Sequence, residues 1–125
     1  MAQSIHVEGF VHKNPIPAAA RVGNFIATGA ITGQDPATGE IVEGAEEQAR
    51  LAFHHLVRIL EAAGVTVDNI LKLTVYVSAQ STRAAVNKQW EIMFPDPDTR
   101  PARHTIEVTL NGKALLQIEA LAVAT

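Results

Sequence analysis

Two polar residues near the end of the chain, Gln117 and Glu119, are candidates for chemistry because they interrupt a long apolar segment. The segment Leu115–Val123 is predicted to be a β-strand, in which residues two apart share a face, so these two side chains project together. The strand looks buried on both faces. A carboxylate in such a strand must be paired, hydrogen-bonded or neutral, because its desolvation costs roughly several kcal/mol.

Arg103 is the natural partner for such a carboxylate. It begins the alternating segment 103–110, and Asn111-Gly112 after it is typical of a two-residue type I′ turn, which predicts a hairpin with the last strand. A guanidinium at the edge of a sheet can bind a carboxylate through two parallel hydrogen bonds, so one interpretation is a site for an organic anion. The alternative is an Arg103–Glu119 ion pair, or a pair across a subunit interface, with no chemical role.

Other catalytic arrangements find little support. The chain has no cysteine, which excludes thiolate catalysis and cysteine-ligated metal centres. His54 and His55 are adjacent on a predicted helix, where their side chains diverge by about 100°, and neither has a metal ligand four residues away. Gly29 and Gly33 do not match a phosphate loop; Gly29 either brings a backbone N–H close to a ligand or marks a β-bulge. We therefore expect no metal and no cofactor.

Composition narrows the class of protein further. The chain has 125 residues, 47% of them hydrophobic, and a net charge of −3, which predicts one folded domain over residues 1–125. Without a cluster of Lys and Arg there is no electrostatic reason to expect nucleic acid. No segment approaches the ~18 apolar residues of a membrane span, and Met1–Glu8 lacks a signal-peptide pattern. We expect a cytoplasmic protein that does not bind membranes.

The clearest predicted element is an amphipathic helix at Ala45–Ala63, because its apolar residues recur at three- and four-residue steps. Charged residues fall on the opposite side, where Glu46 and Arg50 have the spacing of an ion pair, and Gly64 is suited to end the helix.

The remaining elements complete an α+β pattern. They are strands at 4–11, 18–22, 25–28 and 70–77, and a second helix that Ser81 or Thr82 caps, that buries Trp90 and that ends before Pro95. The order of three strands, helix, strand, helix and two strands predicts a mixed sheet with both helices packed on one face.

A series of segments in the same order resembles the RidA family, also called YjgF/YER057c/UK114, over nearly the whole chain. These segments are Val22–Gly29, Asp35–Gly39, Leu60–Gly64, Leu71–Val77, Val86-Asn87, Pro101–Arg103 and Ile118–Ala120. The resemblance implies a chorismate-mutase-like fold and a homotrimer with ligand pockets between neighbouring subunits. It also implies hydrolysis of reactive enamines or imines to 2-oxo acids and ammonia, without a cofactor.

The resemblance also assigns site residues. Arg103 falls on the arginine that clamps the substrate carboxylate, and Thr28 and Gly29 fall on a Ser-Gly pair that lines the pocket. Asn87 falls on the family's asparagine. Thr105 takes the place of a frequent cysteine, whose backbone carbonyl helps to hold the hydrolytic water.

At three pocket positions the sequence departs from the family. Gln117 stands where the family has the glutamate that activates the water, Ile16 replaces a tyrosine, and Ala30 replaces a glutamine. A glutamine can orient water but cannot accept its proton, and such assistance contributes roughly 10²–10⁴-fold. Glu119, about 7 Å along the same strand face, is a candidate substitute. The loss of the tyrosine suggests a different or bulkier substrate.

Two functions from different classes follow. The first is a divergent RidA-like deaminase in which Arg103 binds the substrate carboxylate, the Gly29 N–H lines the pocket, and a water near Thr105 and Gln117 attacks the imine carbon. The second is a non-catalytic carboxylate-binding trimer, either a metabolite sensor or a chaperone-like protein, which explains the missing glutamate directly. Endoribonuclease action, reported for some relatives, fits poorly with an acidic chain that lacks a basic aromatic groove.

Overall fold

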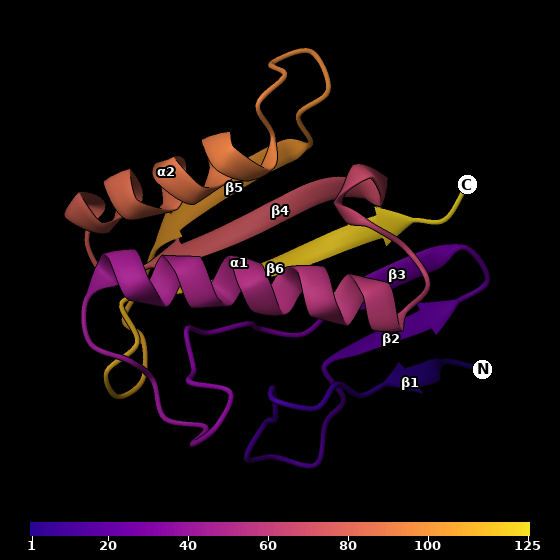
Figure 1. The fold of residues 1–125 in the computed structure, drawn as a ribbon, viewed down its shortest axis with the longest axis horizontal. Helices are drawn as coiled ribbons and strands as arrows, with labels where there is room; N and C mark the ends of the chain where they lie inside the picture. Colours follow the sequence, from indigo (N-terminus) through magenta and orange to yellow (C-terminus); the bar gives the residue numbers. More distant parts are fainter.

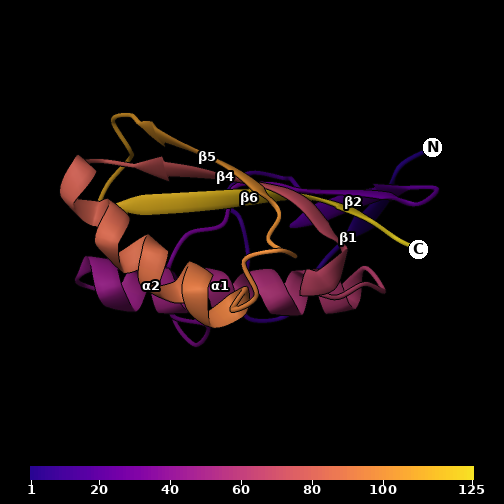
Figure 2. The same cartoon turned by 90° about the horizontal axis from the view of Figure 1, so that it is seen from above.

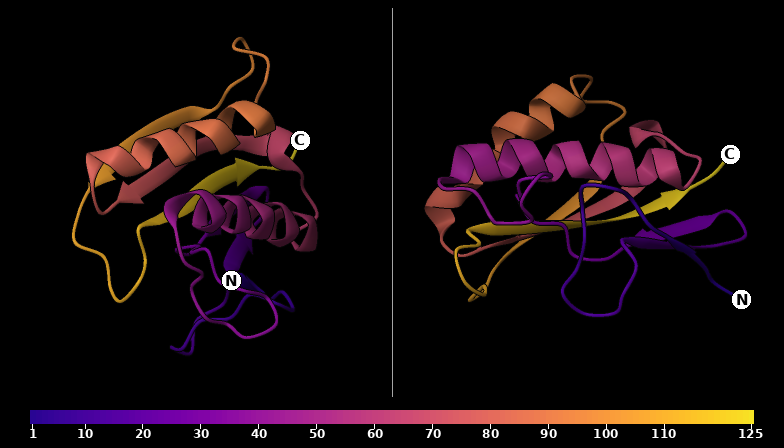
Figure 3. Two further views of the ribbon diagram at one scale, coloured as in Figure 1. Left: turned by 60° about the vertical axis from the view of Figure 1, so that its left-hand side comes forward. Right: turned by 60° about the horizontal axis from the view of Figure 1, so that its bottom comes forward.

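The computed structural model describes all 125 residues and consists of two layers, a six-stranded sheet and two helices that cover one of its faces (Figure 1; Figure 2). Both helices lie on the same side of the sheet in the other views as well (Figure 3). The strands are β1 (Gln3–Ile5), β2 (Ala19–Val22), β3 (Phe25–Thr28), β4 (Ile70–Val77), β5 (Ala102–Glu107) and β6 (Leu116–Val123); the helices are α1 (Ala45–Ala62) and α2 (Arg83–Met93), with 3₁₀ turns η1 (Val67–Asn69) and η2 (Gln80–Thr82). The predicted α+β fold is confirmed. Neither helix is long and apolar enough to cross a membrane.

Helix α1 follows its sequence pattern closely. The predicted apolar stripe faces the sheet, where Leu56 and Leu60 are completely buried, and the predicted charged residues are all exposed. The outer ion pair differs from the prediction, because Arg50 binds Glu47 rather than Glu46. Residues three apart are as close on a helix surface as residues four apart, so the sequence did not decide between the two acids.

The predicted hairpin between the last two strands is wrong, because β5 and β6 do not pair with each other. The sheet order is β1-β2-β3-β6-β4-β5, with β5 parallel to β4 and β6 antiparallel to it. Two strands joined through a helix form parallel pairs readily, and β4, α2 and β5 have this arrangement. The loop 108–115 then crosses β4 to reach β6. A type I′ turn needs positive φ at both central residues; Gly112 has φ +59°, but Asn111 does not have a positive φ.

Helix α2 begins without the side-chain cap that was predicted for it. Thr82 ends the 3₁₀ turn η2 and is itself buried, and no hydroxyl caps the helix. At its other end, Trp90 packs edge-on against Phe94, with ring centroids 4.8 Å apart. This packing confirms the prediction that Trp90 belongs to the core side of the helix.

The sheet has one buried face and one open face. In β6 the residues at alternate positions from Leu116 are buried under the helices, whereas Gln117 and Glu119 on the open face are only half-buried. The prediction that this strand is buried on both faces is therefore wrong. Because paired residues share a face, the register also places Phe25 and Leu121 on the open face, where they are 70% and 49% exposed.

One buried histidine ties the helix layer to the loops. Nε2 of His55, on α1, lies 2.7 Å from the backbone oxygen of Gln34. Burial, outweighing that hydrogen bond, lowers the pKa of His55, and the nearby charges of His54 and Arg58 lower it further. In the folded chain His55 is therefore neutral at pH values at which an unfolded histidine is already protonated.

This difference predicts a pH-dependent stability. Because the unfolded histidine has a pKa near 6.5, the stabilisation is complete above that pH and is lost as the pH falls towards the lower folded pKa. As the pH is lowered from about 7.5 to 5.5, the melting temperature of the wild type should decrease. The melting temperature of the His55→Gln variant should decrease less over the same range. The exposed His104, which does not contribute to the shift of His55, provides the control, since His104→Gln should retain the wild-type slope. Equal slopes for wild type and His55→Gln would contradict the prediction.

Candidate functional site

Arg103 is held in place by two contacts within the chain. It pairs with Leu73 of β4, so it projects from the helix-covered face of the sheet, where it is half-buried. Its Nε donates a hydrogen bond to the hydroxyl of Thr105 at 2.9 Å. The guanidinium carbon lies 5.3 Å from the centre of the Trp90 ring, a cation–π distance. Sequence reasoning placed Trp90 in the core but missed this second role.

No acidic side chain neutralises Arg103. The ion pairs of the chain join Arg50 to Glu47 and Lys113 to Glu43, so the predicted alternative, an Arg103–Glu119 pair, does not form. Burial, and secondarily the charge of Arg83, lowers the pKa of Arg103, yet a guanidinium still carries its charge at neutral pH. A half-buried cation without a counter-ion is a suitable site for an anionic ligand.

Gln117 and Glu119 lie on the other face of the sheet, in contact with β4. The hydroxyl of Tyr76 donates a hydrogen bond to Oε1 of Glu119 at 3.0 Å, and Tyr76 is directly opposite Gln117 in the register. This hydrogen bond and the negative charge of Glu119 raise the pKa of Tyr76. The sequence did not single out Tyr76, because the pairing of β4 with β6 cannot be read from either strand alone.

The strand β3 bulges where it leaves β6. The ladder pairs Ala27 with Leu121, and an isolated bridge pairs Ile31 with Ile118. From one pair to the next, the chain advances by four residues from Ala27 to Ile31 but by only three along β6. Residues 28–30 therefore contain one residue more than the facing part of β6. This is the β-bulge that the sequence left as the alternative for Gly29.

Thr28 and Gly29 use their polar groups within the bulge. The Thr28 hydroxyl accepts the N–H of Ala120 at 2.9 Å and donates to the carbonyl of Gly29 at 2.9 Å. The N–H of Gly29 donates to the carbonyl of Ala18 at 2.9 Å. The expectation that this N–H faces a ligand is not met in the chain, because the fold itself uses the donor.

The predicted site residues fall into two groups that one chain does not bring together. Thr105 pairs with Val75 of β4, and Gln117 lies on β6 beyond β4, so about 10 Å of sheet separates their strands. Their side chains also project from opposite faces. In one copy of the chain the side chains of Thr105 and Gln117 therefore do not face the same space. Asn87 lies elsewhere again, on the exposed side of α2.

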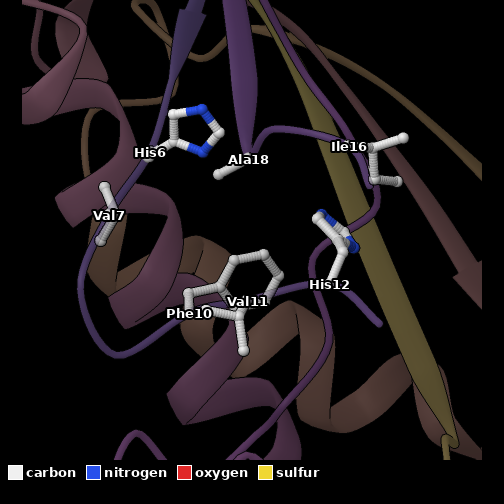
Figure 4. Close-up of a pocket in the computed structure, with 7 residues that line it drawn as sticks. All are labelled: His6, Val7, Phe10, Val11, His12, Ile16 and Ala18. Atoms are coloured by element: carbon white, nitrogen blue, oxygen red, sulfur yellow. The ribbon is translucent and has the colours of Figure 1, made fainter. Parts of the chain in front are cut away.

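Ile16 borders a cavity of about 190 Å³ in the loop between β1 and β2 (Figure 4). The cavity is lined by His6, Val7, Phe10, Val11, His12, Ile16 and Ala18. Ile16 itself is half exposed, and Ala30 lies in the nearby bulge. Ile16 thus contributes to a mainly apolar surface.

Comparison with known proteins identifies the family. Residues 11–124 match the family model described as Endoribonuclease L-PSP. A RutC family protein of Haemophilus influenzae is 36% identical over 127 residues, covering 98% of each chain. The 2-iminobutanoate/2-iminopropanoate deaminase of Escherichia coli is 36% identical over 111 residues, covering 87% of each. The structure of the E. coli YjgF gene product superposes with a TM-score of 0.89 at 33% identity, covering 98% of this chain and 99% of that one. The chain belongs to the RidA family.

In this RidA-family chain, the hydrogen bonds of the bulge predict that removal of the Thr28 hydroxyl destabilises the fold. Thr28→Val keeps the shape but leaves the Ala120 N–H without an acceptor, so the free energy of unfolding should fall by about 1–3 kcal/mol. Thr28→Ser keeps the acceptor and should lose much less. Urea unfolding measures both, with Thr74→Val on β4 as the control for loss of a hydroxyl. If Thr28→Val is as stable as Thr28→Ser, the hydroxyl is not holding β6.

Proposed function

We propose that the protein is a RidA-like enamine/imine deaminase, which hydrolyses a small imino carboxylate to a 2-oxo acid and ammonia without a cofactor. The observation that carries the proposal is the half-buried Arg103 guanidinium, which has no acidic partner and keeps its terminal nitrogens free. Family membership supports the reaction class, since a relative with 36% identity bears the deaminase name.

In this proposal Arg103 binds the substrate carboxylate, while Trp90 and Thr105 set the plane of the guanidinium. A protonated imine then lies where a neighbouring copy presents Gln117 and Glu119. Gln117 orients the water through its amide oxygen, and Glu119 accepts the proton that the water loses.

The chemistry proceeds in two steps. As the water oxygen bonds to the imine carbon, the C=N electron pair moves to nitrogen, and a water proton passes to the carboxylate of Glu119. Glu119 then returns this proton to the nitrogen, the C–N bond breaks, and the carbonyl forms. The remaining hydroxyl proton leaves with the ammonia as ammonium, so charge and atoms balance.

Assembly into a homotrimer is part of the proposal, because one chain separates the two groups of residues. The open face of the sheet supports it: Val22, Phe25 and Leu121 are 55%, 70% and 49% exposed, and they lie on neighbouring strands. An exposed apolar patch of this kind favours contact with another copy of the chain.

The alternative is a carboxylate-binding trimer without catalysis. Gln117 favours it, because a neutral amide stands where the family has the water-activating glutamate. The two functions differ in one measurable respect, since both bind 2-oxo acids through Arg103 but only the deaminase releases ammonia.

Ammonia release from freshly generated 2-iminobutanoate tests the proposal. Arg103→Ala should abolish it, because the carboxylate loses its charged partner, whereas Arg50→Ala removes an exposed charge and should have no effect. Gln117→Glu should raise kcat by up to roughly 10²-fold by supplying a second base. An intact trimer that binds 2-oxo acids but releases no ammonia from any small imine would replace the deaminase with the alternative.

Mixing two inactive variants tests whether the site lies between subunits. One variant carries Arg103→Ala, and the other carries both Gln117→Ala and Glu119→Ala. In a heterologous interface, each site takes Arg103 from one subunit and Gln117 with Glu119 from the next. When the two variants mix randomly in equal amounts, about a quarter of the interfaces combine an intact Arg103 with an intact Gln117 and Glu119. These interfaces should regain activity. Unmixed samples of each variant are the controls. If the mixed trimers stay as inactive as their parents, the two groups of residues do not meet across an interface.

A further inference from the structure

A second arginine, Arg83, also lacks an acidic partner. It is the first residue of α2, it is exposed, and neither ion pair of the chain includes it. Its Nη1 donates a hydrogen bond to Oε1 of Gln80 at 2.9 Å, which is its one hydrogen bond within the chain. A guanidinium has five N–H donors, so most of the donors of Arg83 are free to meet another group.

Arg83 and Arg103 lie at the two ends of one strip of the molecule, where α2 runs alongside β5 in the opposite direction (Figure 1). At one end of this strip, the Arg103 guanidinium lies 5.3 Å from the centre of the Trp90 ring. At the other end, Nε2 of Gln80 donates a hydrogen bond to Oε1 of Glu107 at 2.9 Å. The same Gln80 contacts Arg83, so both cations border the space between the helix and the strand.

Residue spacing turns the two cations towards this space. Arg83 precedes Trp90 by seven residues, about two helical turns, so their side chains leave α2 on the same side. Arg103, Thr105 and Glu107 alternate along β5 and share one face. Because Nε of Arg103 donates to the Thr105 hydroxyl, the Arg103 side chain leans along β5 towards the end at which Arg83 lies.

The two positive charges repel each other, and the chain does not neutralise them. After burial, the charge of Arg83 is the second cause that lowers the pKa of Arg103. Glu107 is the acidic side chain of this strip, but Gln80 lies between it and Arg83, with its amide nitrogen on the carboxylate and its amide oxygen on the guanidinium. A ligand with two negative charges would therefore offset the repulsion more fully than a ligand with one.

We propose that the site takes a dicarboxylate, in which Arg103 binds the carboxylate next to the reacting carbon and Arg83 binds a second carboxylate at the far end of the molecule. The ligand class is then the imino acids derived from acidic amino acids, together with the matching 2-oxo diacids. That this ligand is a substrate rests on the proposed function. The preference for a second carboxylate does not depend on it.

2-Oxoglutarate and 5-methyl-2-oxohexanoate provide a matched pair of probes, because an isopropyl group in the second has the shape of the far carboxylate in the first. Calorimetric titration near pH 7 should show 2-oxoglutarate binding to the wild type about fivefold more tightly, as expected for one partly exposed ion pair. Arg83→Gln should bring the two affinities close to each other. Arg83→Lys keeps the charge and should retain most of the preference.

Lys88→Gln is the control for charge, because Lys88 is an exposed cation of the same helix that lies about 140° around the axis from Arg83. This variant should keep the preference for 2-oxoglutarate. Arg103→Ala should weaken the binding of both acids, since each carries the carboxylate that Arg103 is proposed to bind.

The proposal is overturned if the wild type binds the two acids equally or binds neither, or if Arg83→Gln retains the preference. Loss of the preference in Lys88→Gln, or unchanged binding in Arg103→Ala, would overturn it as well. A wild-type chain that prefers 2-oxoglutarate but releases no ammonia from any imine contradicts the proposed function alone. A chain that releases ammonia but lacks the preference contradicts the dicarboxylate site alone.

Turnover tests the substrate class with the corresponding imines, 2-iminoglutarate and 2-imino-5-methylhexanoate, each freshly generated. We expect KM to be about fivefold lower for 2-iminoglutarate and kcat to be similar for both, because Arg83 binds the far carboxylate and does not act at the reacting carbon. In Arg83→Gln the two KM values should approach each other. Equal KM values in the wild type, with measurable activity, would overturn the substrate class while leaving the deaminase proposal in place.

Discussion

The arrangement of the candidate site depends on the pairing of β4 with strands on both of its edges. The inward residues Leu73, Val75 and Val77 are completely buried, so the alternation of this strand determines which neighbouring side chains face the helices and which face outward. Arg103 consequently projects to the helix side, and Gln117 and Glu119 project to the open side. A site that needs all three must be assembled from more than one chain.

Arg103 combines two requirements that usually conflict. It is buried enough to bind an anion strongly, because water competes less effectively there, yet burying an unpaired charge destabilises the fold. The face of Trp90 and the hydroxyl of Thr105 offset part of that cost without neutralising the charge. The chain thus keeps an unpaired cation in a fixed orientation.

Local patterns predicted much of the fold, whereas contacts between distant segments could not be predicted. The apolar stripe of α1 follows from residue spacing, and so does its end at Gly64, which has φ +85°. The pairing of β6 with β4 does not follow from residue spacing. Asn111-Gly112 favours a hairpin with β5 locally, whereas β4 is the more apolar of the two strands. Residue type and position already made Arg103 a candidate, and the resemblance to the RidA family gave it a role, but no single-sequence signal reveals that Tyr76 contacts Glu119.

The same distinction applies to the bulge at Thr28, whose hydroxyl replaces a backbone acceptor that the ladder lost. Such features depend on three-dimensional context, and they lie close to the residues proposed to bind the ligand.

The position of Trp90 has a practical consequence. The chain contains a single tryptophan, and the Arg103 guanidinium rests on its ring. An anion that binds the guanidinium changes the electric field at the indole, to which its emission is sensitive. Intrinsic fluorescence therefore gives an optical signal for occupancy of this site, free of background from any other indole and without a label.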